Sequence, residues 1–306
     1  MLPPMTSELV EVSPASTSHI SSQVLCHCHW QPETVRAERL TAILLHGLEG
    51  SSQSQYVVGN ANKMWHAGLN VVRMNMRNCG GTESLSPTLY HSGLSGDVNA
   101  VMRFMLGRFG LTRIALVGYS MGGNLVLKCA GELGAEAPPE LKAVVGVSPA
   151  LDLGPSADAL HAPLNRIYER RFLAALLKRF RRKAILFPHV YDPARADGIS
   201  SLRDFDERIT SLYSGFAGAE DYYYRAAAAR VLEKIRTPTL ILHALDDPFV
   251  RLTRESREKI RGNNAIMLLE PEHGGHCAFL ADARPAEHDD GYWAESTLLR
   301  FLLAQG

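Results

Sequence analysis

The chain alternates between short apolar runs and stretches in which apolar residues recur at helical spacing. Turn-forming residues bound the apolar runs. The runs predict strands at 23–30, 41–45, 71–75, 113–117, 143–147, 239–243 and 265–269. Apolar residues at helical spacing predict helices at 53–67, at 95–109, after 120 and at 291–304. Strands that alternate with helices predict the α/β class, with a mostly parallel central sheet covered by helices on both faces.

The alternation of strands and helices is interrupted once, over about 152–236. This segment is helical by composition and lies between one core strand and the next. We therefore expect a single domain over 1–306, in which 152–236 forms a helical cap above one end of the sheet. Residues 1–20 contain three prolines and no clear periodicity, so we expect a loosely ordered lead-in there.

Composition and charge exclude several classes of protein. The 306 residues include 32 Lys and Arg against 32 Asp and Glu, so no net charge attracts nucleic acid. Residues 1–20 have neither the basic nor the apolar region of a secretion signal, and no apolar run reaches the roughly 18 residues of a membrane span. The five cysteines are scattered, which favours reduced thiols and a cytoplasmic protein.

The strongest chemical signal is Gly-Tyr-Ser-Met-Gly at 118–122. It matches the G-x-S-x-G nucleophile elbow, with a predicted strand before it and a helical pattern after it. Such a strand–turn–helix raises a serine hydroxyl out of the sheet. We therefore expect Ser120 to be a catalytic nucleophile.

A serine nucleophile needs a base to take its proton and an acid to orient that base. Two aspartates follow the strand at 239–243, and we prefer Asp247 to Asp246 as the acid because it precedes a proline at the end of the turn. Two histidines follow the strand at 265–269, and we prefer His276 to His273 as the base because a Gly-Gly pair precedes it. Both choices remain open at this point.

An oxyanion hole needs two backbone N–H groups directed at the developing negative charge. The amide of Met121, which follows the nucleophile, is one candidate. The other lies in the loop after the strand at 41–45, where Leu48 is the expected donor and His46 is expected to shape the turn.

Taken together, these motifs resemble those of the YheT-type α/β-hydrolases, from about residue 40 to 295. The resemblance is carried by 46–51 (HGLEGS), 77–82 (RNCGGT), 118–123 (GYSMGG), 205–206 (FD), 246–249 (DDPF) and 273–276 (HGGH). This bacterial group is similar to the mammalian α/β-hydrolase-domain lipases, although no N-terminal membrane anchor like theirs is visible here. The resemblance implies the α/β-hydrolase fold and a serine hydrolase that acts on carboxylic esters, including lipid esters. It carries the roles of nucleophile, acid and base onto Ser120, Asp247 and His276.

Three other patterns have both a functional and a structural interpretation. Cys26-His27-Cys28-His29 has metal-binding residue types, but alternate residues of a strand point to opposite faces, so we expect no metal site there. The strongly basic segment 166–183, with an apolar stripe of Leu173, Leu176 and Leu177, favours a solvated cap helix, and peripheral membrane contact is the alternative. Tyrosines 222–224 would line an acyl pocket or pack the cap against the core.

The sequence therefore predicts a serine esterase of lipid or other esters, working through an acyl-enzyme without metal or cofactor. An acyltransferase, an amidase or a peptidase would use the same three residues. A non-catalytic lipid-binding module is a further alternative. A dinucleotide-dependent oxidoreductase is disfavoured, because no G-x-G-x-x-G follows the first core strand.

Overall fold

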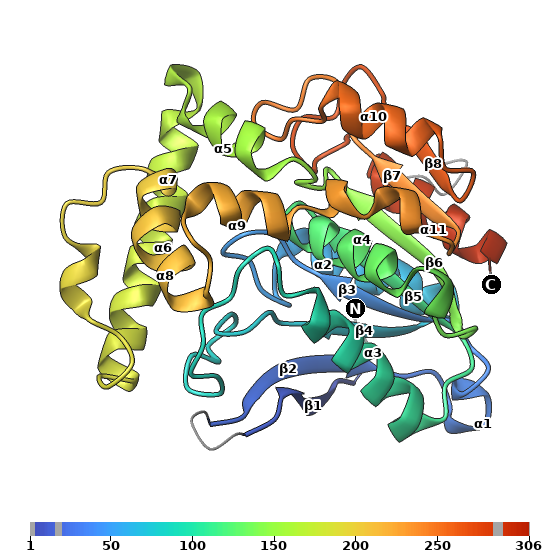
Figure 1. Ribbon diagram of the computed structural model, residues 1–306. Helices are drawn as coiled ribbons and strands as arrows, with labels where there is room; N and C mark the ends of the chain where they lie inside the picture. The colour runs from blue at the N-terminus through green and yellow to red at the C-terminus, as the bar shows by residue number, and fades with distance from the viewer. Residues whose placement is uncertain (1–3, 16–19, 284–289, 306) are drawn as a thin grey trace.

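A central sheet of eight strands organises the computed structural model, which describes residues 4–15, 20–283 and 290–305 (Figure 1). The strands are β1 (Thr6–Ser13), β2 (Ser22–His29), β3 (Thr41–Leu45), β4 (Asn70–Met74), β5 (Ile114–Tyr119), β6 (Leu141–Val147), β7 (Thr239–Leu242) and β8 (Ile266–Leu269). Their order across the sheet is β1-β2-β4-β3-β5-β6-β7-β8. From β4 to β8 all neighbours are parallel, whereas β2 is antiparallel to both β1 and β4. The predicted α/β class is confirmed.

Helices cover the two faces of this sheet. α3 (Ser95–Phe109) and α4 (Met121–Leu133) pack on one face, and α2 (Gln55–His66) and α11 (Trp293–Gln305) pack on the other. Strand β3 shows why its sequence is apolar throughout: Ile43 and Leu45 belong to the first core, while Ala42 and Leu44 belong to the second. Both faces of the strand are buried, so no position favours a polar side chain.

The expectation of a loosely ordered lead-in at 1–20 is wrong for the part that the structure describes. Thr6–Ser13 forms β1 and pairs antiparallel with β2, from Thr6 opposite Cys28 to Ser13 opposite Ser22. Only Val10 is fully buried in β1, so the strand lacks the alternation that sequence patterns detect. The backbone pairing with β2 holds β1 in place instead. Residues 1–3 and 16–19 lie outside the described ranges.

Between β6 and β7 the chain forms a group of helices that gathers at one end of the sheet (Figure 1). These are α5 (Leu153–His161), α6 (Arg166–Leu186), α7 (Leu202–Phe205), the π-helical turn η4 (Asp206–Thr210), α8 (Ser211–Ser214) and α9 (Ala219–Ala226). Two shorter helices flank the sheet elsewhere, α1 (Glu33–Arg36) and α10 (Arg254–Arg261). Throughout the described ranges, no helix combines the length and apolar character needed to cross a bilayer.

Candidate active site

The backbone turns sharply at Ser120, between the end of β5 and the start of α4. Its φ of 54° and ψ of −116° lie outside the regions that L-residues favour. A Cβ atom on Gly118 would lie 2.1 Å from the carbonyl oxygen of Gly122, and one on Gly122 would lie 2.4 Å from that of His46. Only glycine fits at these two positions, so the local sequence dictates the turn that presents the serine.

A continuous line of hydrogen bonds joins Ser120, His276 and Asp247. Ser120 Oγ lies 3.0 Å from His276 Nε2, and His276 Nδ1 lies 2.9 Å from Asp247 Oδ2. The Asp247 side chain is fully buried, and its other oxygen accepts backbone N–H bonds from Phe249 (3.1 Å) and Val250 (2.9 Å). Because the carboxylate accepts from Nδ1, that nitrogen carries the proton and Nε2 can accept one from the serine.

Asp246 and His273 form a second pair outside this line. His273 Nδ1 lies 3.4 Å from Asp246 Oδ2, and the histidine side chain is 88% exposed. Asp246 Oδ1 also accepts the backbone N–H bonds of Gly274 (3.0 Å) and Gly275 (2.8 Å). Asp246 and His273 therefore stabilise the loop that carries His276 and do not contact its side chain within the described ranges.

The surroundings of His276 favour its protonated form. Burial alone would lower the pKa of His276, but the adjacent Cys277 and the hydrogen bond with Asp247 outweigh burial and raise the pKa above its ordinary value. The ring of Phe249 covers the imidazole, with ring centroids 4.3 Å apart. The same contacts would stabilise the imidazolium that forms when His276 takes a proton from the serine.

Two backbone amides beside Ser120 are available to an oxyanion. Within the described ranges, the amides of Leu48 and Met121 donate to no protein acceptor. Both residues line the same cavity as Ser120. These are the two donors expected from the sequence, and the start of α4 adds the positive end of a helix dipole beside them.

The loop that carries Leu48 is held on both sides of that residue. The amide of Gly47 donates to the Tyr56 hydroxyl (2.8 Å), and that of Glu49 donates to the Tyr90 hydroxyl (3.2 Å). Both neighbours of Leu48 are therefore fixed by tyrosine hydroxyls, while its own N–H is left unused.

His46 sits at the base of this loop and is fully buried. Its Nε2 accepts the amide hydrogen of Met76 (3.1 Å), so its Nδ1 carries the proton that bonds to the carbonyl of Gly47 (2.7 Å). Burial lowers the pKa of His46 to about 4. His46 is therefore a neutral link between the loops that follow β3 and β4, in agreement with its expected role in the turn.

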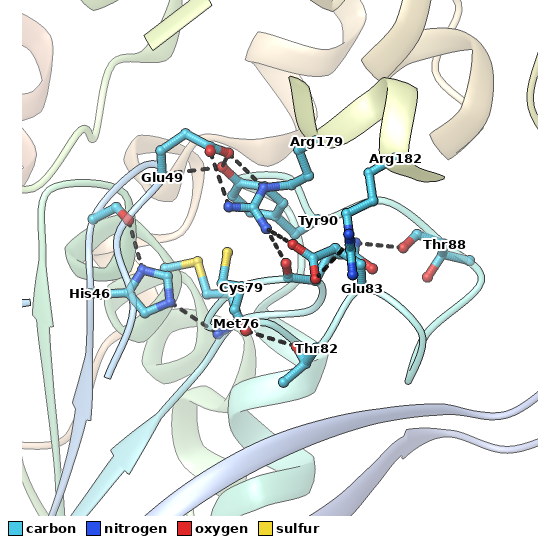
Figure 2. A network of polar contacts seen from close by, with 12 residues as sticks. His46, Glu49, Met76, Cys79, Thr82, Glu83, Thr88, Tyr90, Arg179 and Arg182 are labelled. Carbon is cyan, nitrogen blue, oxygen red and sulfur yellow. Dashed lines mark hydrogen bonds and ion pairs between the residues drawn. The ribbon is translucent and has the colours of Figure 1, made fainter. Parts of the chain in front are cut away.

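Arg179 of α6 connects the inserted helices to the loop of Leu48 (Figure 2). Its guanidinium donates to both carboxylate oxygens of Glu49, at 2.9 and 3.0 Å. The same group bonds to the carbonyl of Asn78 and to Glu83 (3.3 Å) and lies over the ring of Tyr90. Both members of the Arg179–Glu49 pair are close to fully buried, so one helix fixes the loops that follow β3 and β4.

Two cavities meet at Ser120, and Leu48, Ser120 and Phe172 line both. The smaller cavity has a volume of about 120 Å³ and lies under the inserted helices. Its walls are mostly apolar, with Ala157, Leu160, Leu176, Leu202, Phe205 and Val250 among them. The larger cavity, of about 990 Å³, is lined by both apolar and charged side chains, with Lys63, Arg171, Asp290 and Glu295 among the charged ones.

The basic segment 166–183 lies within α6, and not all of its basic side chains face solvent. The apolar stripe of Leu173 and Leu176 is buried against the protein, as is Lys183, which donates to the carbonyls of Glu83 (3.0 Å) and Ser86. The solvent-exposed basic residues of the helix are Arg166, Arg170, Arg171, Lys178, Arg181 and Arg182. The large apolar residues exposed on α6 are instead Ile167, Tyr168, Ile185 and Leu186.

Asn124 is a site residue that the sequence reading missed. This fully buried side chain of α4 donates to the carbonyls of Ser92 (2.8 Å) and Ala226 (3.0 Å) and accepts from the amide of Ala228 (2.7 Å). It links α4, the helix that follows Ser120, to the end of α9. Its signal in the sequence is a single polar residue within an otherwise apolar helical run.

The Cys-His-Cys-His segment has the alternation expected of a strand. Cys26 and Cys28 are buried in one core, whereas His27 contacts Ser52 and His29 contacts Arg73 on the opposite side. Across the described residues, no group of three or more His, Cys, Asp or Glu side chains is placed to hold a metal ion.

Residues 43–283 match the family described as the alpha/beta hydrolase fold. The chain belongs to this family. Among related α/β-hydrolases is YheT of Escherichia coli, whose name assigns it to the esterases. It is 32% identical to this chain over 255 residues, which cover 82% of this chain and 74% of YheT. The resemblance to the YheT-type α/β-hydrolases is confirmed.

Phospholipase ABHD3 of Bos taurus is 28% identical over 250 residues. The match covers 81% of this α/β-hydrolase and 60% of ABHD3, so the chain spans about three-fifths of that relative. The solved structure of Est1E from Butyrivibrio proteoclasticus has the same fold, with a TM-score of 0.57, 15% identity and 98% of each chain covered. The chain is thus an α/β-hydrolase of the esterase and lipase type.

Proposed function

We propose that this α/β-hydrolase cleaves carboxylic esters through an acyl-enzyme formed on Ser120. The hydrogen-bonded line from Ser120 through His276 to Asp247 carries the proposal. Ser120 Oγ attacks the ester carbonyl while His276 Nε2 takes its proton, and Asp247 holds the imidazole in the tautomer that can do so. His276 then gives the proton to the departing alcohol, and water attacks the acyl-enzyme by the same route.

In this mechanism the amides of Leu48 and Met121 form the oxyanion hole. Each N–H would donate to the carbonyl oxygen as it becomes negative in the tetrahedral intermediate. The lack of a protein acceptor for either amide supports this role. The fixed loop around Leu48 supports it as well, because preorganised donors need no rearrangement during the reaction.

The two cavities at Ser120 divide the proposed substrate into an acyl part and an alcohol part. The apolar cavity of about 120 Å³ suits the acyl chain, and the cavity of about 990 Å³, which has charged groups in its lining, suits the alcohol. A cavity of about 150 Å³ holds a six-carbon ring, so the smaller cavity has room for an acyl chain on the order of four to six carbons. The names of ABHD3 and of the Saccharomyces cerevisiae monoacylglycerol lipase favour lipid esters for this chain also.

The inserted segment 152–236 is proposed to act as the cap over this site, since α5, α6 and α7 all contribute to the smaller cavity. We further propose that the exposed basic residues of α6, with Ile167 and Ile185, make peripheral contact with anionic membranes. The five free cysteines favour a reducing cytoplasm.

The test is hydrolysis of p-nitrophenyl esters with acyl chains from about two to sixteen carbons, by the wild type and Ser120→Ala. We expect a maximum rate at the short lengths and a loss in Ser120→Ala on the order of a millionfold in kcat. Equal inactivity of both proteins at every length would overturn ester hydrolysis as the function. A maximum at long chains would overturn the assignment of the acyl chain to the smaller cavity.

A further inference from the structure

One carboxyl group lies in the wall of the otherwise apolar cavity beside Ser120. Of the described residues that line this cavity, Asp206 is the only carboxylate. It begins the π-helical turn Asp206–Thr210, in the middle of the inserted segment. π-Helical turns of this kind are rare and occur frequently at functional sites. The mechanism proposed above makes no use of Asp206.

Asp206 is hydrogen-bonded but not saturated. Thr210 Oγ1 donates to Asp206 Oδ1 (2.7 Å), and the Tyr223 hydroxyl donates to Asp206 Oδ2 (2.8 Å). Both donors line the cavity themselves. A carboxylate oxygen accepts two hydrogen bonds, so each oxygen of Asp206 retains room for a donor from a bound molecule.

No cation is paired directly with this carboxylate within the described ranges. The nearby guanidinium of Arg203 is engaged by Asp158 (2.7 Å) and by Glu220, and it stacks on the ring of Tyr223. Burial raises the pKa of Asp206 to about 6, against the opposing effect of its two hydrogen bonds and Arg203. At neutral pH the group is therefore mostly ionised in apolar surroundings, where an additional hydrogen-bond donor stabilises it.

We propose that Asp206, held by Thr210 and Tyr223, forms a subsite for a hydrogen-bond donor on the acyl chain of the substrate, such as a hydroxyl group. The inference rests on the proposed function, which places the acyl chain in this cavity. A plain alkyl chain would cover the carboxylate without pairing it, whereas a hydroxylated chain would donate to it. Sites built to hydrogen-bond a substrate group discriminate against the analogue that lacks it.

The test compares p-nitrophenyl hexanoate with its 3-hydroxy, 6-hydroxy and 6-methoxy analogues. The methoxy ester places an oxygen in the cavity but cannot donate. We expect at least one hydroxy ester to exceed hexanoate and the methoxy ester by about tenfold in kcat/KM. In Asp206→Ala this ratio should fall to near one, and in Asp206→Asn, which preserves size, it should fall in the same direction. Asp197→Asn, an exposed aspartate of the same segment, should keep the wild-type ratio.

If Asp206 has only a structural role, its substitution should change kcat/KM for all four esters by the same factor. The ratio of hydroxy ester to hexanoate would then stay at the wild-type value. If the wild type hydrolyses hexanoate through Ser120 but shows no preference for either hydroxy ester, the subsite is refuted and the proposed function stands. A preference that survives both Asp206 variants would also refute it. If no ester is hydrolysed in a Ser120-dependent way, the proposed function fails, and the subsite falls with it.

Discussion

The adjacent aspartates Asp246 and Asp247 have different surroundings beside His276. Asp247 is buried, bonds to His276 and accepts two backbone amides, whereas Asp246 is largely exposed and bonds to His273 and the loop backbone. The chain therefore contains its own matched control for the role of a carboxylate. One aspartate fixes the imidazole that faces Ser120, and its neighbour fixes only the loop.

This difference predicts unequal effects of the same substitution. Asp247→Asn should lower kcat by about ten thousandfold, because an amide does not hold the imidazole in the required tautomer. Asp246→Asn removes the exposed contact with His273 but keeps an oxygen that can accept the loop amides, so the expected loss is less than about tenfold. Steady-state kinetics of both variants on one short-chain ester measures this. Comparable losses in the two variants would contradict the assignment of the acid.

The predictability of each site residue depends on how local its determinants are. Ser120 could be predicted because the strand, the glycines and the helix that position it are contiguous in sequence. The choice of Asp247 over Asp246 depends on which carboxylate turns inward to the amides of Phe249 and Val250. The order of polar and apolar residues in the sequence does not determine this geometry. Asp206 was visible only as part of a motif, since its cavity is built from several distant helices.

At the scale of elements, α6 is coupled to the oxyanion loop by the Arg179–Glu49 pair (Figure 2). Glu49 adopts a φ of 56°, a strained conformation for a residue with a side chain. The bidentate contact and the Tyr90 hydroxyl both act on Glu49, directly beside Leu48. A shift of α6 would therefore displace the amide of Leu48, the proposed oxyanion donor.

Loss of this coupling should affect catalysis more than substrate binding. Arg179→Met leaves the Glu49 carboxylate buried without its partner, so we expect kcat to fall by roughly ten- to a hundredfold with a small change in KM. Arg181→Met, on the exposed side of the same helix, should leave both constants unchanged. An increase in KM alone would show that Arg179 acts on binding and not on the oxyanion loop.

The elements that sequence analysis located best are the short apolar strands, most of which are buried on both faces. Strands β3 to β8 are short and apolar, so their positions agree with the predicted runs to within two residues. β5 extends to Tyr119 because Gly118 and Tyr119 still pair with β6. β1 was missed because an edge strand with one buried side chain has no periodic signal. The inward turn of Lys183 was missed because the charge of a helix does not reveal which face packs.

At the scale of the whole molecule, Lys183 makes stability depend on pH. Burial lowers the pKa of Lys183 to about 7 from the ordinary value of 10.5, while Glu83 acts in the opposite direction. Between these two values the unfolded chain binds more protons than the folded one, so the folded state gains stability as the pH rises. Below pH 7 Lys183 is protonated in both states, so this gain in stability is absent.

The variant Lys183→Met should therefore lose this pH dependence. From pH 7 to pH 9, the free energy of unfolding of the wild type should rise relative to Lys183→Met, by about 2 kcal/mol. Urea unfolding of both proteins at the two pH values measures the difference. Lys178→Met, on the exposed side of α6, should follow the wild type. Parallel behaviour of wild type and Lys183→Met would contradict the lowered pKa.

The separation of 156 residues between Ser120 and His276 has a consequence for biosynthesis. A nascent chain that has emerged only as far as α9 contains the proposed nucleophile, its turn and the inserted helices, but neither Asp247 nor His276. Its serine then has the low reactivity of an ordinary alcohol. Contacts between such distant residues also close late in folding. The ribosome therefore exposes no active hydrolase until β7, β8 and the loops that follow them have docked on the sheet.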